Sequence, residues 1–324
     1  MDPRNPATGP ACPTSPAKLV AGLKGHTDGA TALAFAADRC LLASAGRDGS
    51  ARVWDIASSK PGERAVLRKP GDTFRALAFA PNSRLLAAGA GSASGLVWLF
   101  DLTDKTPQET ATLRGARGSV GALAFSPDGK LVAGGGEDQT LRLWEPGPGF
   151  RGDPRTLLLG HTRPIGALAF APDGQSIASA AGDATVRVWA LSRIRSSQRA
   201  LLPHPAEVNS LAYSPDGKTL ATACRDGRIR LWDVTAIKPT VRAELAAPPG
   251  GARLVLVPDA GSLVSVGDGT RVTNWDARTG KPLREWEVPG GPAAGVALTP
   301  DGRYLARGTG AGAVEVYRVA EKRA

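Results

Sequence analysis

The sequence predicts an all-β fold, a seven-bladed β-propeller of four-stranded antiparallel blades in a ring closed by an N-terminal strand. Two spacings support this prediction. An aromatic residue recurs every 42 to 46 residues, at Trp54, Trp98, Trp144, Trp189, Trp232, Trp275 and Tyr317. A second anchor lies 19 residues before each of these, at Phe35, Phe79, Phe125, Phe170, Tyr213, Leu256 and Leu298. A spacing repeated in seven units defines a structural repeat, and four short strands at this period are typical of a propeller blade.

Each unit shows three strands divided by two turns, most clearly in residues 120–144. The first turn, residues 126–129, has the sequence Ser-Pro-Asp-Gly, in which proline fixes φ and glycine supplies a positive φ. The second turn carries Asp138. In the third strand, residues 141–144, apolar and polar residues alternate, which predicts one packed and one solvated face. Short apolar runs before each following unit indicate a fourth strand.

The ring is expected to close through the N-terminus. A leucine marks the fourth strand between several units, at Leu67, Leu113, Leu158 and Leu201. Leu23 has the same place before the first unit, although no unit precedes it. We therefore expect residues 18–23 to pair with the strand that ends at Tyr317 and so complete the seventh blade. The predicted organisation is a flexible segment at 1–17, a propeller at 18–319 and a short tail at 320–324.

The ends of the units carry a family signature. Gly25-His26 with Trp54-Asp55, and Gly160-His161 with Trp189, resemble the Gly-His and Trp-Asp ends of WD40 repeats. The resemblance covers residues 18–319, and the segment 275–283 is similar to bacterial repeats of this family. It implies a hydrogen-bonded tetrad of His, Ser or Thr, Asp and Trp inside a blade. Three tetrads are complete: His26, Ser44, Asp48 and Trp54 in blade one; His161, Ser179, Asp183 and Trp189 in blade four; His204, Thr222, Asp226 and Trp232 in blade five.

The other four blades depart from the tetrad pattern. Blade three keeps Asp138 but has Ala116 and Gly134 at the His and Ser positions. Blades two and seven have Pro70 and Pro289 at the His position. These blades are expected to depend on strand pairing and on the packing of the aromatic residue, since each blade is also held by its neighbours.

The sequence gives no sign of catalytic chemistry, a metal site or a cofactor site. All three histidines occupy tetrad positions, where both ring nitrogens would be engaged in a buried network. The three cysteines, Cys12, Cys40 and Cys224, are far apart and odd in number, which favours a reducing compartment and a cytoplasmic location. The glycine-rich stretches 89–95 and 308–312 coincide with turns and lack the lysine of a phosphate-binding loop. No apolar run approaches the length of a membrane span, and the N-terminus lacks the apolar segment of a signal peptide.

The resemblance implies a binding platform whose top face, around the central channel, contacts partners. The positions expected to line this face lie four and six residues before the first anchor and directly before the tetrad Asp. Most of them hold small residues, and none is aromatic. What remains is a polar arc that we expect to contact a partner, made of Arg47, Arg75, Glu207, Asn209 and Arg225.

The sequence therefore predicts a non-catalytic scaffold that binds other proteins and is monomeric by itself. Two alternatives stay open. The net charge of +10 fits a propeller associated with nucleic acid, although Arg, Ala, Gly and Pro all have GC-rich codons that could produce this balance. A regulatory subunit of a signalling kinase or protease is the other alternative. A second candidate surface is the basic segment after blade four, with Arg193, Arg195 and Arg199, which reads as a soluble loop.

Overall fold

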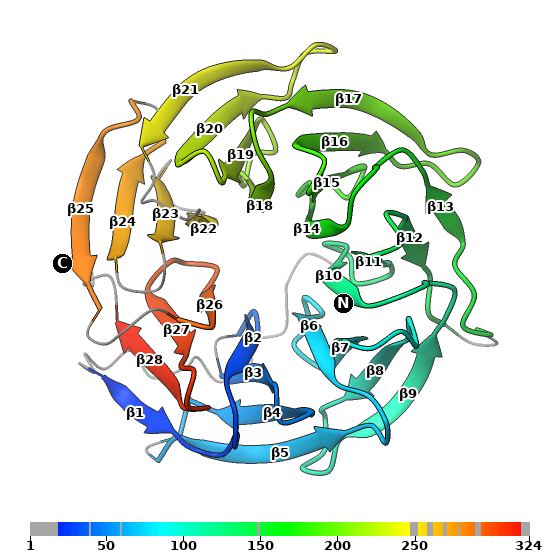
Figure 1. Cartoon of the computed structure of the whole chain (residues 1–324), viewed down its shortest axis with the longest axis vertical. Coiled ribbons are helices and arrows are strands. Elements are labelled where there is room, and N and C mark those ends of the chain that lie inside the picture. Colours follow the sequence, from blue (N-terminus) through cyan, green and yellow to red (C-terminus); the bar gives the residue numbers. More distant parts are fainter. Residues whose placement is uncertain are drawn as a thin grey trace, which may run out of the picture.

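The computed structural model describes residues 19–38, 40–58, 60–147, 150–246, 252–257, 262–267, 271–277, 279–288 and 293–318. These residues form seven four-stranded antiparallel sheets around a central axis, with no helix among them (Figure 1). The fold class predicted from the sequence, a seven-bladed β-propeller, is confirmed. The predicted flexible segment 1–17 and tail 320–324 lie outside the described residues.

Each blade runs from an inner strand beside the axis to an outer strand at the perimeter, and the blades are numbered from the sheet that begins with β2. The inner strands are β2 (Ala30–Phe35), β6 (Phe74–Phe79), β10 (Val120–Phe125), β14 (Ile165–Phe170), β18 (Val208–Tyr213), β22 (Ala252–Val257) and β26 (Gly295–Leu298). The second strands are β3 (Leu41–Gly46), β7 (Leu85–Ala90), β11 (Val132–Gly136), β15 (Ser176–Ala181), β19 (Thr219–Cys224), β23 (Ser262–Gly267) and β27 (Tyr304–Gly308).

The third and outer strands complete the blades. The third strands are β4 (Ser50–Asp55), β8 (Val97–Asp101), β12 (Leu141–Trp144), β16 (Thr185–Ala190), β20 (Arg228–Asp233), β24 (Arg271–Asp276) and β28 (Val314–Arg318). The outer strands are β5 (Gly62–Arg68), β9 (Gln108–Leu113), β13 (Thr156–Leu158), β17 (Ser197–Pro203), β21 (Thr240–Ala246), β25 (Pro282–Glu287) and, in blade seven, β1 (Val20–Leu23).

The strand β1 closes the ring as the leucine pattern predicted. It pairs antiparallel with β28, with Val20 opposite Val316 and Leu23 opposite Val314. Leu23 is buried against Val314 and Val316 and against Trp54 of blade one. The last blade is therefore built from both ends of the described chain.

The hydrophobic core lies between neighbouring blades rather than inside one. A representative cluster joins Leu141, Leu143 and Leu158 of blade three to Ile165 and Trp189 of blade four. Because the strands alternate in side-chain direction, each sheet presents an apolar face to both of its neighbours. A blade therefore cannot bury its apolar residues alone, which makes the closed ring the unit of stability.

Blade two differs from the repeat inferred from the spacing. In blade one Leu42 lies opposite Trp54, but in blade two the equivalent Leu86 lies opposite Phe100 and not Trp98. The 19-residue spacing to Trp98 is therefore not the structural equivalent of the other six. The loop between β7 and β8 holds two extra residues, which moves the aromatic position two residues along the strand.

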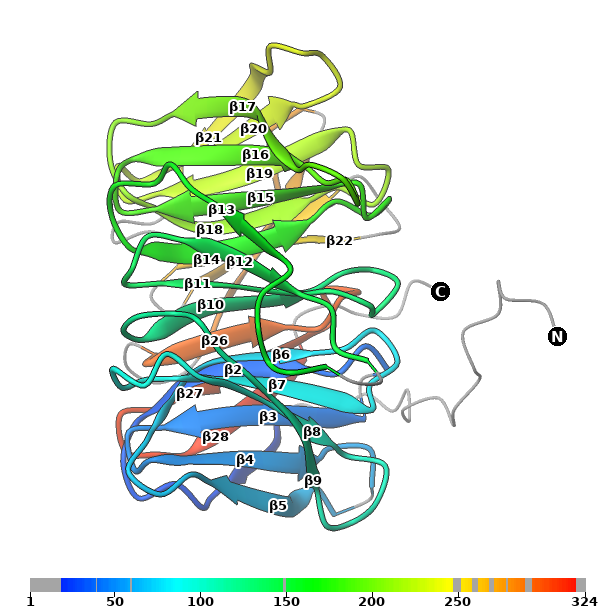
Figure 2. The ribbon, with the colours of Figure 1, turned by 90° about the vertical axis from the view of Figure 1, so that its right-hand side faces the viewer.

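The propeller has two faces with different loops (Figure 2). The top face, turned to the viewer in Figure 1, carries the loops from second to third strands and from outer strands to the next inner strand. The bottom face carries the turns between first and second strands and between third and outer strands. The turn of residues 126–129 shows why these stay tight: Gly129 has φ 71°, its N–H donates to the carbonyl of Ser126 at 2.8 Å, and the Ser126 hydroxyl accepts from the N–H of Leu131 at 2.8 Å.

Candidate protein-interaction face

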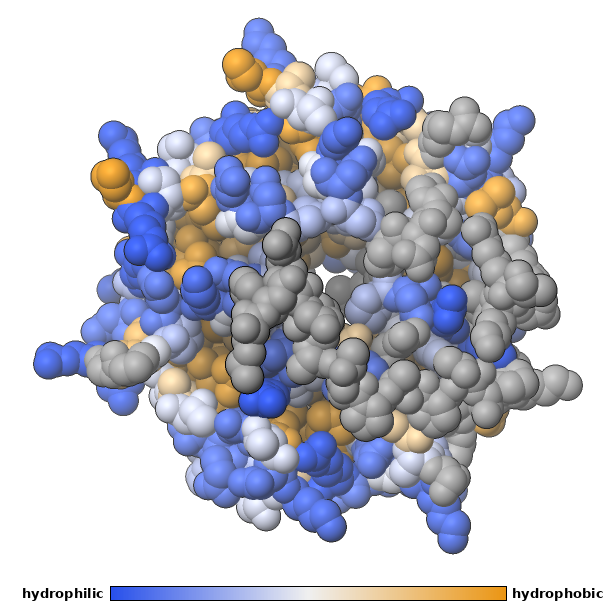
Figure 3. Space-filling model, turned by 180° about the vertical axis from the view of Figure 1, so that it is seen from behind, coloured by the Kyte–Doolittle hydropathy of each residue, from blue (hydrophilic) through white to orange (hydrophobic). Residues whose placement is uncertain are grey.

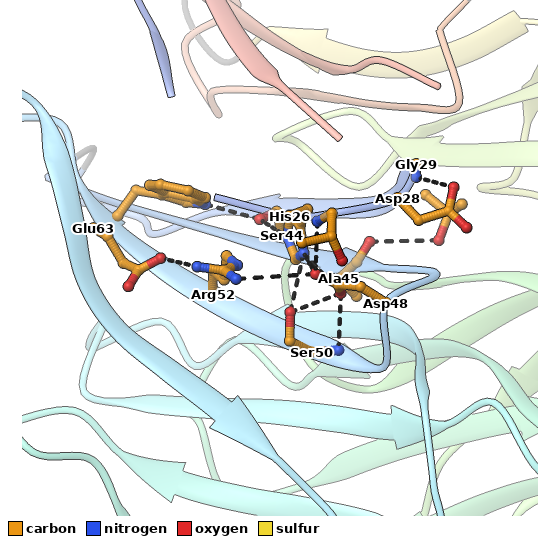
Figure 4. Close-up of polar contacts among 12 residues, drawn as sticks. His26, Asp28, Gly29, Ser44, Ala45, Asp48, Ser50, Arg52 and Glu63 are labelled. Atoms are coloured by element: carbon orange, nitrogen blue, oxygen red, sulfur yellow. Dashed lines mark hydrogen bonds and ion pairs between the residues drawn. The ribbon is translucent and has the colours of Figure 1, made fainter. Parts of the chain in front are cut away.

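Two top-face loops of blade one are joined by a buried polar network (Figure 4). His26, in the loop before β2, has its Nε2 atom 2.7 Å from Oγ of Ser44 and its Nδ1 atom 3.0 Å from Oδ1 of Asp48. The indole N–H of Trp54 donates to the same Ser44 Oγ at 2.8 Å. Since that hydroxyl accepts from Trp54, its own proton is directed to Nε2 of His26. The imidazole therefore carries its proton on Nδ1 and donates it to the carboxylate.

Burial sets the charge state of this network. Burial lowers the pKa of His26 and outweighs the opposing effect of Asp48, so the imidazole is neutral at pH 7. Burial by itself would raise the pKa of Asp48, but hydrogen bonds from Ser50, Thr27 and His26 hold that pKa well below its usual range. With both ring nitrogens engaged, the histidine has none left for proton transfer or metal binding.

Blade four has the same arrangement. His161 has Nε2 at 2.8 Å from Oγ of Ser179 and Nδ1 at 2.9 Å from Oδ2 of Asp183. Trp189 donates to Ser179 Oγ at 2.8 Å. Burial also lowers the pKa of His161. The structure therefore brings together all four residues of the tetrads inferred for blades one and four.

Blade five departs from the inferred tetrad. Nε2 of His204 lies 2.9 Å from Oγ1 of Thr222, which also accepts from the indole of Trp232 at 3.1 Å. Nδ1 of His204, however, donates to the backbone carbonyl of Leu202 at 3.1 Å and not to Asp226. The expectation that Asp226 closes this network is wrong.

The length of the connection before the histidine explains the difference. In blade four the buried Leu158 precedes His161 by three residues. In blade five the buried leucine is Leu202, two residues before His204, while Leu201 is 46% exposed. Leu201 is therefore not the equivalent of Leu158, as the sequence pattern suggested. The shorter connection keeps the ring of His204 close to its own strand, where the Leu202 carbonyl is the nearest acceptor.

In blades three and five, an arginine of the third strand binds the carboxylate at the Asp position. Arg230 contacts Asp226 at 2.6 Å, and Arg142 contacts Asp138 at 2.7 Å. Both arginines are buried and lie two residues before the tryptophan of their strand. In blade three the histidine position holds Ala116. In these two blades the guanidinium thus binds the carboxylate that no imidazole reaches.

The remaining blades use other side chains. In blade two the carboxylate comes from the opposite loop, because Asp72 accepts from the Ser94 hydroxyl and from the N–H of Ser92. In blade seven Arg307 and Glu315 lie opposite each other on neighbouring strands and form an ion pair at 2.8 Å.

The polar networks position the top-face residues through the backbone. In several blades the residue before the Asp position donates its N–H to the carbonyl of the residue six positions before the first anchor. Arg47 donates to Gly29 at 2.9 Å, and Arg225 donates to Glu207 at 2.8 Å. In these blades, two of the inferred top-face positions are therefore hydrogen-bonded to each other: the residue directly before the Asp position and the residue six positions before the first anchor.

These loops surround a cavity of about 870 Å³ at the mouth of the central channel. Four residues of the polar arc, Arg47, Arg75, Glu207 and Asn209, line this cavity. Arg225 is outside the lining, but its guanidinium contacts the carboxylate of Glu207 at 2.9 Å. Residues chosen from three separate blades thus gather around one opening.

The charges around the opening are only partly paired. Arg75 reaches from blade two to blade three, where it lies 3.7 Å from Glu137 and 3.3 Å from the Ser119 hydroxyl. Both side chains of the Arg75–Glu137 pair are more than half exposed, as is that of Arg225, so a partner can compete for these contacts. Arg47 is exposed and forms no ion pair with any described residue.

Sequence reasoning missed part of this face. The buried side chains of Phe74, Ile165 and Val208 form the walls of the cavity. They share a position five residues before the first anchor, which is a periodic signal in the sequence. Arg117 and Arg163, exposed in the loops that enter blades three and four, add cations to the same face but have no common repeat position.

Four segments of the chain match the family model described as WD domain, G-beta repeat: residues 17–55, 107–145, 152–190 and 195–233. The chain therefore contains WD40 repeats within a seven-bladed propeller. Each matched segment consists of an outer strand followed by the first three strands of the next blade. No curated protein matches the chain. Blades two, six and seven, which no segment matches, have neither His nor Asp at the tetrad positions.

Across the described parts of the chain, no helix has the length and apolar character that crossing a bilayer requires. In the same parts, no three His, Cys, Asp or Glu side chains gather closely enough to hold a metal ion.

Proposed function

We propose that this protein is a non-catalytic scaffold that presents the top face of its propeller to partner proteins in a cytoplasmic assembly, and that it is monomeric by itself. One observation carries the proposal. Four of the polar residues selected from blades one, two and five line a single cavity at the channel mouth, although they are up to 162 residues apart in the sequence. Propellers with WD40 repeats generally act as platforms for protein interaction.

The charge pattern favours a partner with an acidic segment. Arg47 has no carboxylate partner among the described side chains, and the exposed Arg75 and Arg225 are held only by exposed ion pairs. Arginine is enriched among residues that dominate interface energy. Glu137 and Glu207 would repel an acidic ligand placed in the wrong register, which gives the site a means of selecting its partner.

The proposed absence of catalysis rests on the chemistry of the three histidines. Each has both ring nitrogens in hydrogen bonds, and burial lowers the pKa of each. The buried Cys224 donates its thiol to the carbonyl of Ala206, and burial raises its pKa. These groups therefore lack the exposure and the free atoms that a general base or a nucleophile needs.

The test is a triple variant in which Arg47, Arg75 and Arg225 are changed to Ala. Bait proteins are incubated with lysate of the native host, with and without nuclease. The variant is expected to lose partners that the wild type retains, while its melting temperature stays within about two degrees, because exposed substitutions usually change stability by less than about 0.5 kcal/mol. A matched control replaces three exposed arginines away from this face, Arg84, Arg151 and Arg242, and should retain every partner.

The two treatments separate the possible ligands. A partner lost after nuclease, with binding that falls steeply as salt increases, would identify nucleic acid as the ligand in place of protein. Recovery of every partner by the triple variant would contradict the top-face proposal.

A further inference from the structure

Two neighbouring hairpins on the bottom face carry unusually exposed aliphatic side chains. Ile194, between β16 and β17, is 97% exposed, and Ile237, between β20 and β21, is 85% exposed. The next most exposed large aliphatic side chain in the described chain is Leu159, at 68%. Figure 3 looks onto the bottom face and shows hydrophobic side chains protruding at the outer rim beside strongly hydrophilic ones. Such side chains have no packing role in the propeller.

The two hairpins lie side by side. Arg199 on β17 extends to the next blade and donates Nη2 to the carbonyls of Val234 at 2.8 Å and Thr235 at 3.2 Å. Thr235 is two residues before Ile237. The contact therefore fixes the second hairpin against the first, and both isoleucines belong to one stretch of rim formed by blades four and five.

All charged side chains in the loops of these two hairpins are cations. Arg193 and Arg195 flank Ile194, and Lys238 follows Ile237; all three cations are exposed and form no ion pair with any described residue. Residues 191–196 and 234–239 contain no Asp or Glu. The hairpin of blade two differs, because Asp104 precedes Lys105 there.

The acidic side chains nearest the two hairpins are engaged with neighbouring groups. Asp233, at the end of β20, accepts from the N–H and the hydroxyl of Thr235 at 3.0 and 2.6 Å. Glu145 lines the same pocket as Arg193 and pairs with Arg155 at 2.8 Å.

Two further carboxylates stand in the turns between first and second strands. Asp173 accepts from the N–H of Gln175, and Asp216 accepts from Ser214 and from the N–H of Lys218. They are engaged within their own turns. A partner that touches the rim therefore meets exposed cations and aliphatic side chains, while the carboxylates beside them are already engaged.

Several backbone N–H groups of the first hairpin have hydrogen-bond partners within the hairpin, so they do not need water as a partner. The N–H groups of Ile194 and Arg195 donate to the Ser192 hydroxyl at 3.1 and 3.4 Å. The Ser192 N–H donates to the Ser196 hydroxyl at 3.3 Å. In the second hairpin, Pro239 has no N–H to satisfy. On partial entry of the first turn into a lipid headgroup region, the N–H groups of Ser192, Ile194 and Arg195 would therefore stay paired.

We propose that the bottom rim of blades four and five, defined by Arg193, Ile194, Arg195, Ile237 and Lys238, attaches the propeller reversibly to an anionic lipid surface. Aliphatic side chains that enter the boundary between headgroups and acyl chains, surrounded by cations, are what peripheral attachment requires. The rim is convex and its two isoleucines stand on separate turns. A fluid interface accepts this shape directly, whereas a protein partner would need two matched pockets. The attachment is to the surface only, and it leaves the top face free for partners.

The test is sedimentation of the purified full chain with two kinds of vesicle, phosphatidylcholine alone and phosphatidylcholine with about 30 mol% phosphatidylglycerol. Binding is expected only to the anionic vesicles and should weaken as salt increases. Each cation near an anionic surface contributes about 1 kcal/mol, or roughly fivefold in affinity, so changing Arg193, Arg195 and Lys238 to Gln should weaken binding about a hundredfold. The double variant Ile194→Ser with Ile237→Ser should also lose binding.

The matched control is Leu157→Ser with Leu159→Ser, which removes two exposed leucines at the outer edge of blade three. It should bind as the wild type does, and all variants should melt at the wild-type temperature, because none of these side chains is packed. Absence of vesicle binding, equal binding to neutral and anionic vesicles, or unchanged binding by the isoleucine variant would overturn the proposal. A protein captured through these side chains without vesicle binding would also overturn it. The triple arginine variant of the top face should sediment normally, so the two proposals fail independently.

Discussion

Blades three and four have the same strand plan but hold their top-face loops together with different chemistry. In blade four Asp183 is bound by the neutral imidazole of His161, and in blade three Asp138 is bound by the guanidinium of Arg142. The tryptophan of blade four donates to the Ser179 hydroxyl, whereas Trp144 of blade three donates to a backbone carbonyl.

The feature that both blades share is a carboxylate between two loops. Asp183 accepts backbone N–H groups of Thr162, in the loop entering the blade, and of Thr185, beyond the turn, both at 3.0 Å. Asp138 likewise accepts the N–H of Arg117 at 2.8 Å, as well as that of Thr140. The bridge between loops is thus set by the carboxylate and the backbone. A histidine with a hydroxyl, as in blade four, and an arginine, as in blade three, are two ways to complete the hydrogen bonding of this carboxylate.

The largest effect is expected from the tryptophans, and it should be similar in the two blades. Trp189→Ala and Trp144→Ala each remove a buried ring from an interblade cluster, so each should lower the free energy of unfolding by roughly 3–5 kcal/mol. Equilibrium unfolding in urea measures both. A loss below about 1 kcal/mol for either variant would mean that its ring is not part of the core.

Substitution of the equivalent arginine should lower the free energy of unfolding by different amounts in the two blades. Arg142→Met leaves the partly buried Asp138 without its charged partner, so a loss of about 1–3 kcal/mol is expected. Arg187, at the same position in blade four, donates to Gln198 and forms no ion pair with any described residue, so Arg187→Met should change stability by less than about 1 kcal/mol. Equal effects in urea unfolding would show that the guanidinium of Arg142 does not replace the imidazole.

Restoring the missing hydroxyl should not restore the tetrad. A Cβ atom added at Gly134 would lie 2.8 Å from the Cζ3 atom of Trp144, because the indole of blade three occupies the space that Ser179 has in blade four. Gly134→Ser should therefore destabilise the protein by about 1–3 kcal/mol. A thermal melt compares it with Ser179→Ala, which removes the hydroxyl shared by His161 and Trp189. An increase in melting temperature for Gly134→Ser would contradict this packing argument.

The smallest effect is a pH dependence that only the histidine-containing blades produce. The pKa of His161 in the folded chain lies below the unfolded value of about 6.5, so the unfolded state binds more protons as the pH falls through this range. Stability should decrease on acidification from about pH 7.5 to 5.5, by at most about 1.4 kcal/mol per pH unit for each histidine. His161→Gln should reduce this slope in urea unfolding. An unchanged slope would show that His161 is not the titrating group.

Much of the site could be predicted from the sequence because the repeat fixes positions relative to the anchors. His26, Ser44 and Asp48 meet in blade one because their spacing places them on adjacent strand ends. The gathering of Arg47 and Glu207 at the channel mouth follows from the same rule applied to different blades. The rule failed where a connection is one or two residues shorter or longer than in the repeat. One residue fewer before His204 redirects its ring, and two extra residues in the loop of blade two put Phe100 in the place expected for Trp98.

The sequence by itself determined the strand order, the ring with its N-terminal closing strand and part of the set of residues around the channel mouth, because these depend on periodicity and turn chemistry within one unit. Only the tertiary structure decided which side chain satisfies each buried carboxylate, since an arginine follows the Asp by four residues in blades three, four and five alike. Arg142 and Arg230 bind Asp138 and Asp226, whereas Arg187 donates to Gln198. It also decided that Ile194 and Ile237 share one exposed rim. That depends on the contact of Arg199 with the next blade, between segments that are distant in the sequence but adjacent in the ring.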